Sequence, residues 1–275
     1  MTRVAVLGFG LIGGSLALGL RAAQRGYHVT AVDRAEVIHT AQAQSAADAI
    51  VDVSDEAALS NALAACDIAV LAMPVAVIAE KLPWVLERAA VVTDCGSTKR
   101  FIAARARGHA RAGRFVPGHP MAGLPAGGAC NATATLFRDK SWLLCAAGCD
   151  ADAVSLVESL VRDVGARLVH MDVEQHDAAV ARTSHLPQVL ASALALMVEA
   201  HGARAAAGPA FERATLSAGG PGPIWRDIFA SNGDEIARAI RELCETLEPI
   251  ARELAAGEKT AAVEELLARA RAIRS

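Results

Sequence analysis

The chain has 275 residues, of which 53% are hydrophobic and 4% aromatic, and its formal net charge is −3. This length can bury a sizeable core in one large or two modest domains. A slightly acidic chain lacks the basic stripe of a nucleic-acid binder, and no apolar run reaches the roughly 18 residues of a membrane span. We therefore expect neither nucleic acid nor membrane as a partner. The six scattered cysteines form no C-x-x-C pair and no zinc-ligand spacing, so we expect reduced thiols, no metal and a cytoplasmic location.

The first 26 residues permit two interpretations. One arginine followed by an apolar stretch is typical of a secretory signal, but four glycines interrupt that stretch and no small-residue cleavage site follows. We favour the second interpretation, which is a buried strand over residues 3–8, a glycine turn, and a helix over residues 15–26.

The glycines of this turn match the dinucleotide-binding fingerprint G-x-G-x-x-G. Gly8 would form the tight turn, Gly10 would let a pyrophosphate approach the backbone, and Gly13 would let helix and strand pack closely. Backbone amides at the helix start, including those of Leu11 and Ile12, would then bind the phosphates.

A second predicted strand, residues 27–33, ends at Asp33, which lies 20 residues after Gly13. A carboxylate there can bind the ribose hydroxyls of NAD and would repel the extra phosphate of NADP. Arg34 leaves NADP possible, because an arginine could pair with a 2′-phosphate, although a solvated surface charge is the simpler interpretation. We therefore expect NAD as the cofactor.

Two more buried strands are predicted over residues 67–74 and 89–97, each ending in a loop. Ligands of open parallel sheets bind outside the carboxyl ends of the strands, so Met73, Pro74 and Gly96 should face the cofactor. Further strands are predicted at 113–123, with a loop that carries His119, and at 142–147 and 167–172, around a helix over 150–165. Residues 1–172 thus predict a doubly wound, Rossmann-type α/β domain.

Residues 173–275 predict an all-helical substrate and dimerisation domain. Residues 176–202 form one long helix, or a pair broken near Pro187, where proline removes a helical hydrogen bond. Asn232 followed by Glu235 predicts a helix start with a capping box. An apolar seam for another helix follows, made of Ile236, Ile240, Leu243, Leu247, Ile250 and Leu254. The partner helix could belong to the same chain, but so small a domain favours a homodimer.

Five segments, in order along nearly the whole chain, resemble the motifs of the prephenate and arogenate dehydrogenase family. They are GFGLIGGS at 8–15, DCGSTK at 94–99, GHPMAG at 118–123, HD with SHLP between 176 and 187, and IWRDIFASN at 224–232. The resemblance implies oxidative decarboxylation of a cyclohexadienol to a phenol with NAD or NADP, a step of tyrosine biosynthesis.

Such a reaction removes hydride from the ring carbon that bears the hydroxyl group while the opposite ring carbon loses carbon dioxide. The protein must align that carbon with the nicotinamide and accept the hydroxyl proton. His119 is the candidate acceptor, and Ser97 would bind the same hydroxyl or the imidazole. Alternatively, His119 stabilises its own turn beside Pro120, and Ser97 caps the helix that follows it. Lys99 fits a solvated helix position as well as a substrate contact.

The resemblance also implies that Arg226 binds the ring carboxylate, for which a planar guanidinium is well suited; the alternative is an ion pair with Asp227 or Glu235. Many relatives read SHLPH, whereas this chain has Gln188 as the last residue. A neutral glutamine near the substrate's side chain would not repel the ammonium group of arogenate. The substitution favours acceptance of arogenate, alongside prephenate or instead of it.

His176 and His185 lie nine residues apart, which places them on opposite faces of an unbroken helix. We expect His185 in the pocket and His176, paired with Asp177, as structural support. Two other functions stay open. A β-hydroxyacid dehydrogenase would use a lysine in its helical domain, but residues 173–257 contain none. A non-catalytic NAD-binding sensor would not need His119 or Arg226.

Overall fold

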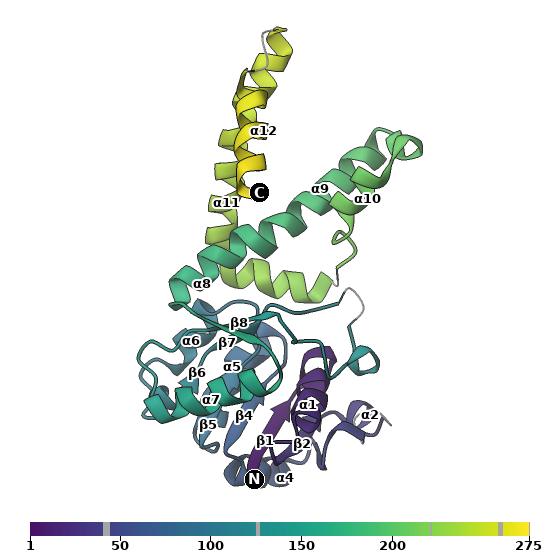
Figure 1. Cartoon of the computed structure of the whole chain (residues 1–275). Helices are drawn as coiled ribbons and strands as arrows, with labels where there is room; N and C mark the ends of the chain where they lie inside the picture. The colour runs from purple at the N-terminus through teal and green to yellow at the C-terminus, as the bar shows by residue number, and fades with distance from the viewer. Residues whose placement is uncertain (41–44, 125–126, 221, 258–260, 275) are drawn as a thin grey trace.

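The structure, a computed structural model, describes residues 1–40, 45–124, 127–220, 222–257 and 261–274. The N-terminal part forms an α/β unit at the bottom of Figure 1, and long helices project from it. The expected fold class, a Rossmann-type parallel sheet followed by a helical region, is confirmed.

The main sheet consists of six parallel strands. They are β1 (Thr2–Leu7), β2 (Tyr27–Asp33), β3 (Ala49–Asp52), β4 (Ile68–Leu71), β5 (Val91–Asp94) and β6 (Phe115–Val116). Their order is β3-β2-β1-β4-β5-β6, and Val4 of β1 lies between Val29 of β2 and Ile68 of β4. The direction of winding reverses between β1 and β4, where such sheets bind ligands. β3 has no counterpart among the predicted strands.

Helices cover both faces of this sheet. They are α1 (Leu11–Ala23) and α7 (Ala151–Asp163) on one face, and α4 (Glu56–Ala65), α5 (Val75–Leu86) and α6 (Arg100–Ala106) on the other. Because side chains alternate along a strand, Val4 and Val6 join the buried cluster of α1 and α7. Ala5 and Leu7 join the cluster of the other three helices. Burial on both faces explains why these strands are almost entirely apolar.

The three late strands form a separate sheet, which corrects the expectation that they extend the doubly wound one. They are β7 (Gly118–Pro120), β8 (Ser141–Leu144) and β9 (Arg167–His170), with β7 antiparallel to β8. Pro117 separates β6 from β7, and a proline has no N–H to continue a ladder. His119 therefore lies within a strand, opposite Leu143, and not in a loop after one.

The helical region begins with one continuous run. It comprises α8 (Val173–Val180), a π-helical turn (Ala181–His185) and α9 (Leu186–Ala200). Pro187 lies in the first turn of α9, where its missing N–H is tolerated. The π-helical turn lies directly before it and changes the hydrogen-bond pattern of the run at this point. Both sequence alternatives were partly right, because the helix is continuous but changes its geometry just before Pro187.

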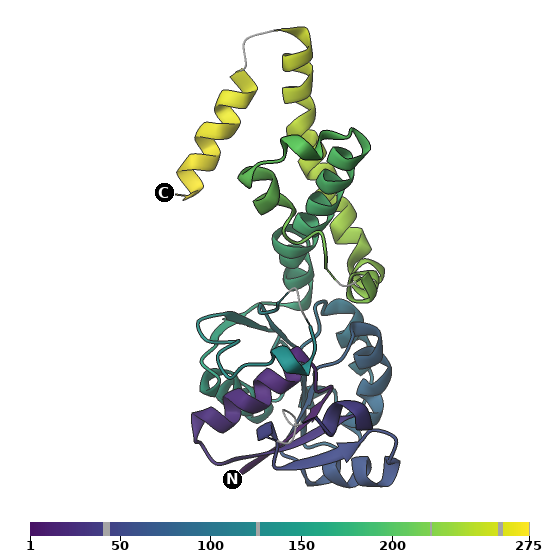
Figure 2. The same cartoon turned by 90° about the vertical axis from the view of Figure 1, so that its right-hand side faces the viewer.

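Two arms project above the sheet (Figures 1 and 2). One is α9 with α10 (Pro209–Thr215), and the other is α11 (Gly222–Ala256) with α12 (Ala261–Arg274). α11 bends at Asn232, whose backbone is non-helical. Of the predicted seam, Ile236 is buried, whereas Leu247 and Leu254 are 46% and 57% exposed. In the part of the chain that the structure describes, no helix is apolar enough over a sufficient length to cross a membrane.

Candidate active site

The glycine turn between β1 and α1 leaves room for a ligand at one position. A Cβ atom on Gly8 would lie 2.4 Å from the carbonyl oxygen of Ala72, and one on Gly13 would lie 2.0 Å from that of Gly8. A Cβ atom on Gly10 would meet no atom within 4 Å. Gly10 also caps α1 without a side-chain hydrogen bond, so the first amides of the helix are available to an anion.

Asp33 lies at the carboxyl end of β2, directly beside this turn. Its carboxylate accepts hydrogen bonds from the amides of Phe9 (2.6 Å) and Arg34 (2.7 Å). The Arg34 guanidinium is exposed and lies 3.0 Å from the carboxylate of Glu36. The backbone thus fixes the Asp33 carboxylate beside the glycine turn, and the exposed Arg34 lies 4.0 Å from it on the other side.

The other predicted cofactor residues follow β4 and β5. Met73 lies against Gly8, with its Cγ atom 2.8 Å from the position of a Cβ there, and Pro74 caps α5. Gly96 has a packing reason to be glycine, since a Cβ atom would lie 2.5 Å from Ile102. Its amide donates to Asp94 (2.8 Å) and is not free to bind a ligand.

Lys99 and Asp94 form a buried ion pair directly behind His119. The Lys99 ammonium, which is fully buried, contacts the Asp94 carboxylate and donates to the carbonyl oxygen of Gly118 at 2.5 Å. The other carboxylate oxygen of Asp94 accepts from the Gly118 amide at 3.1 Å. The expectation of a solvated helix residue is wrong, because the side chain is fully buried in this ion pair. The pair holds β7 to β5 at the residue before His119.

His119 contacts His176 directly. Nδ1 of His119 lies 2.9 Å from Nε2 of His176, and Nδ1 of His176 lies 2.8 Å from the Asp177 carboxylate. The expected pairing of His176 with Asp177 is present, but its contact with His119 was missed. The sequence offered no signal for this contact, because it joins a strand to a helix 57 residues later.

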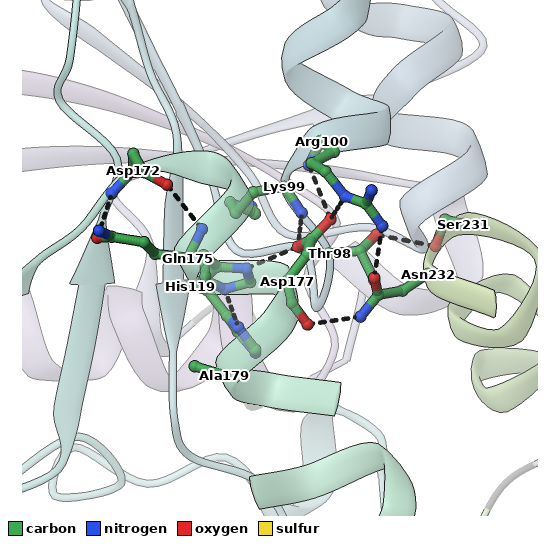
Figure 3. Close-up of polar contacts among 12 residues, drawn as sticks. Thr98, Lys99, Arg100, His119, Asp172, Gln175, Asp177, Ala179, Ser231 and Asn232 are labelled. Carbon is green, nitrogen blue, oxygen red and sulfur yellow. Dashed lines mark hydrogen bonds and ion pairs between the residues drawn. The ribbon is translucent and has the colours of Figure 1, made fainter. Parts of the chain in front are cut away.

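Asp177 caps helix α6 from the helical region, as Figure 3 shows. Its carboxylate accepts from the amides of Lys99 (2.7 Å) and Arg100 (3.0 Å) and from the Arg100 side chain (3.2 Å). The expectation that Ser97 caps this helix is therefore wrong, since α6 begins three residues after it. Ser97 is half-buried in the preceding loop.

Asn232 lies where the capping box was predicted, but its side chain forms hydrogen bonds to other elements instead of capping the helix. It accepts from Arg100 (3.0 Å), donates to the Asp177 carbonyl oxygen (2.9 Å) and lies 3.3 Å from Nδ1 of His185. Asn232 therefore ties the bend of α11 to α6, to α8 and to His185. The predicted helix boundary is right, and the predicted hydrogen-bond pattern is wrong.

His185 is buried and packs edge-to-face against Trp225, with ring centroids 6.1 Å apart. The π-helical turn interrupts the helix between the two histidines; His176 contacts His119 of the α/β unit, whereas His185 contacts Asn232 and Trp225 of α11. Burial, more than any neighbouring charge, lowers the pKa of His185 to about 4, so its imidazole is neutral at physiological pH.

Gln188 and Arg226 line one cavity of about 530 Å³, together with Val189, Ser192, Ala218, Gly220, Gly222, Trp225 and Phe229. Gln188 donates to Ser192 at 3.4 Å. Arg226 is exposed, and within the described ranges its expected ion-pair partners are engaged elsewhere: Asp227 accepts from the Ala76 amide, and Glu235 pairs with other arginines.

The electrostatics of the site keep its imidazoles neutral. Burial lowers the pKa of His119 well below its usual value, and His176, Lys99 and His185 lower it further. Burial also lowers the pKa of His176, against the opposing effect of Asp177. For Asp177, burial opposes ionisation, but the hydrogen bonds from His176, Lys99 and Arg100 lower its pKa below the usual value. A neutral His119, linked through His176 to an ionised Asp177, can accept a proton.

Comparison with known proteins identifies relatives of the whole chain. The family model of the prephenate dehydrogenase nucleotide-binding domain matches residues 16–170, and that of the prephenate dehydrogenase dimerization domain matches residues 172–269. A prephenate dehydrogenase of Lactococcus lactis is 28% identical, with 91% of this chain and 71% of the relative covered. A cyclohexadienyl dehydrogenase of Zymomonas mobilis is 29% identical over 83% of this chain and 80% of the relative. The crystal structure of Aquifex aeolicus prephenate dehydrogenase superposes with a TM-score of 0.84 at 26% identity and covers 100% of both chains.

Proposed function

The chain belongs to the prephenate dehydrogenase family, and we propose that it catalyses the oxidative decarboxylation of prephenate, of arogenate or of both, with NAD as oxidant. The products are 4-hydroxyphenylpyruvate from prephenate and tyrosine from arogenate. The observation that carries this proposal is the buried, neutral His119, which lies where the α/β unit meets the helical region.

The glycine turn fits a dinucleotide. The open space at Gly10 and the uncapped amides of α1, including those of Leu11 and Ile12, suit a pyrophosphate, and Asp33 suits the adenosine ribose. When bound, NAD supplies the hydride acceptor. The Arg34 guanidinium is paired with Glu36. This pairing supports NAD over NADP, because a 2′-phosphate would need a cation there.

His119 accepts the hydroxyl proton as hydride leaves the same ring carbon. Its burial keeps the imidazole neutral and free of competing water, so its lone pair is available at physiological pH. Ser97, in the loop after β5, is assigned to hydrogen-bond the same hydroxyl group. Loss of carbon dioxide makes the ring aromatic, which supplies the driving force.

The cavity of Gln188 and Arg226 is assigned to the carboxylates and the side chain of the substrate. Arg226 is free of an ion pair in the described chain and can bind a carboxylate in a fork. His185 contacts Trp225, which lines the same cavity, and also Asn232, which donates to the Asp177 carbonyl oxygen; these contacts connect the cavity to the centre around His119. The neutral Gln188 supports acceptance of arogenate.

We place the boundary between the two domains at residues 172 and 173, where the strands end and α8 begins. The exposed Leu247 and Leu254, which continue the buried seam of Ile236, support a homodimer formed through the helical domain. The six cysteines are all free thiols, which supports a cytoplasmic location.

The test is a parallel assay of NADH formation and carbon dioxide release with prephenate and with arogenate. We expect equimolar NADH and carbon dioxide from at least one of them. Arg226→Ala should raise KM at least about tenfold, ~1.4 kcal/mol, with a smaller effect on kcat, because the contact exists before reaction. Arg252→Ala, which removes an exposed charge farther along α11, is the matched control and should change neither constant.

NAD binding without turnover of either substrate would contradict the proposal and favour the sensor. Oxidation of a β-hydroxyacid instead would favour the other alternative. An unchanged KM in Arg226→Ala would show that the carboxylate binds elsewhere.

A further inference from the structure

We infer that Asp177 and His176 are positioning residues that hold His119 in the one tautomer whose Nε2 atom can accept a proton. This inference rests on the proposed role of His119 and adds the reason why its imidazole presents the correct nitrogen. The three side chains form a line, with 2.8 Å between Asp177 and His176 and 2.9 Å between the two imidazoles. His176 and Asp177 are fully buried, so water does not compete for these hydrogen bonds.

The line begins with the protonation state of Asp177. One of its oxygens accepts from the Lys99 amide and the other from the Arg100 amide and side chain, and all three partners are donors. A carboxylate surrounded by donors is ionised and has no proton to give. Nδ1 of His176, which lies against the same carboxylate, must therefore be the donor.

The proton on Nδ1 of His176 then determines whether the other nitrogen, Nε2, donates or accepts. A neutral imidazole carries only one proton, so Nε2 of His176 is an acceptor. The atom that faces it is Nδ1 of His119, which must donate. His119 consequently keeps its lone pair on Nε2, the nitrogen that is not engaged by His176.

The competing arrangement is a doubly protonated His176, which would donate to His119 and leave the proton on the wrong nitrogen. The Asp177 carboxylate beside His176 favours such a positive charge, but burial outweighs it, and the pKa of His176 lies below its usual value. Lys99, from the loop before α6, acts against it on both imidazoles, and His185, from the π-helical turn, acts against it on His119. Asp94 favours the charge, but its carboxylate is already paired with Lys99. Burial of both rings opposes the imidazolium further.

Asp177→Asn tests this order of donors and acceptors. An amide can turn its NH2 group toward His176 and so invert both imidazoles, which would place the proton on Nε2 of His119. We expect kcat to fall about 10²- to 10⁴-fold, with KM within about threefold of the original. Nitrogen NMR of 15N-histidine-labelled full chain should show the Nδ1–H tautomer of His119 originally and the Nε2–H tautomer in the variant.

His176→Gln in the Asp177→Asn background separates tautomer control from a merely structural role. The oxygen of a glutamine amide can accept from Nδ1–H of His119 whichever residue stands at position 177, because a glutamine has no tautomer to set. The double variant should therefore recover at least about tenfold in kcat over Asp177→Asn, although it has lost one more native side chain. Should Asp177→Asn not fold, His176→Gln and His176→Leu form the substitute pair, and the glutamine variant should be at least about tenfold more active.

An Nε2–H tautomer in the unaltered protein, an unchanged tautomer in Asp177→Asn, or a folded double variant no more active than Asp177→Asn would each overturn the inference. In the substitute pair, equal activities would do the same. The NMR measurement needs no substrate. Absence of activity with both substrates would therefore contradict the proposed function while leaving the tautomer of His119 measurable.

Discussion

Asp33 is held by two backbone amides at the end of β2, so its carboxylate has little freedom to turn away from a ligand in the glycine turn. This geometry makes it the residue that decides between a free ribose and a phosphorylated one. Its negative charge would repel the 2′-phosphate of NADP, and the nearby Arg34 is paired with Glu36.

Replacing Asp33 with serine should narrow the preference for NAD over NADP. The substitution removes the repulsion of a 2′-phosphate and also the ion pair of Arg34 with Asp33 (4.0 Å), so the ratio of the two kcat/KM values should fall at least about tenfold, ~1.4 kcal/mol. Asp48→Ser is the matched control, because Asp48 precedes β3, at the opposite end of this pair of strands. An original enzyme that prefers NADP would contradict this role of Asp33.

Residue identity alone predicts some site residues and not others. The places of Asp33 and the three glycines in the structure were predictable, because they follow from spacing along one βαβ unit. Lys99 was not, because its burial depends on Asp94 and on Gly118 in another strand. The contact of His176 with His119 likewise arises only from tertiary packing.

At the scale of elements, the strand, turn and helix at the N-terminus follow from local sequence. The structure gives different reasons for a glycine at the three positions of the turn. Gly8 and Gly13 avoid backbone atoms, whereas Gly10 faces open space. The first two reasons concern folding, and the third concerns a ligand.

Alanine substitutions should separate these reasons. Gly13→Ala should lower the free energy of unfolding by about 1–3 kcal/mol, because its methyl group would collide with the Gly8 carbonyl. Gly10→Ala should stay within about 0.5 kcal/mol of the original but bind NAD at least about tenfold more weakly. Urea unfolding and NAD titration measure the two effects. Normal NAD affinity in Gly10→Ala would place the pyrophosphate elsewhere.

Other elements escaped prediction for physical reasons. β3 has the sequence AIVD, and an apolar run of only three residues does not distinguish a strand from part of a helix or loop. The π-helical turn before Pro187 has no compositional signature, and only a break of some kind could be expected there. Late strands were recognised, but their membership of a second sheet depends on where Pro117 ends β6.

At the scale of the whole molecule, the catalytic centre joins the two parts of the chain. His119 comes from β7, and its neighbours His176 and His185 come from the helical run that stands on the α/β unit (Figures 1 and 2). Arg100 strengthens the junction, because it pairs with Asp177 of α8 and with Asp234 of α11. The sequence predicted both parts but could not show which helix face meets the sheet.

The most direct test of this account is the steady-state turnover of His119→Ala with whichever substrate proves active. The imidazole acts mainly as the hydroxyl proton is lost, so we expect kcat to fall about 10²- to 10⁴-fold, with little change in substrate KM. NAD affinity should be retained, because His119 is assigned to the substrate side of the nicotinamide. Near-normal turnover in a folded His119→Ala enzyme would remove this histidine from the mechanism and contradict the account.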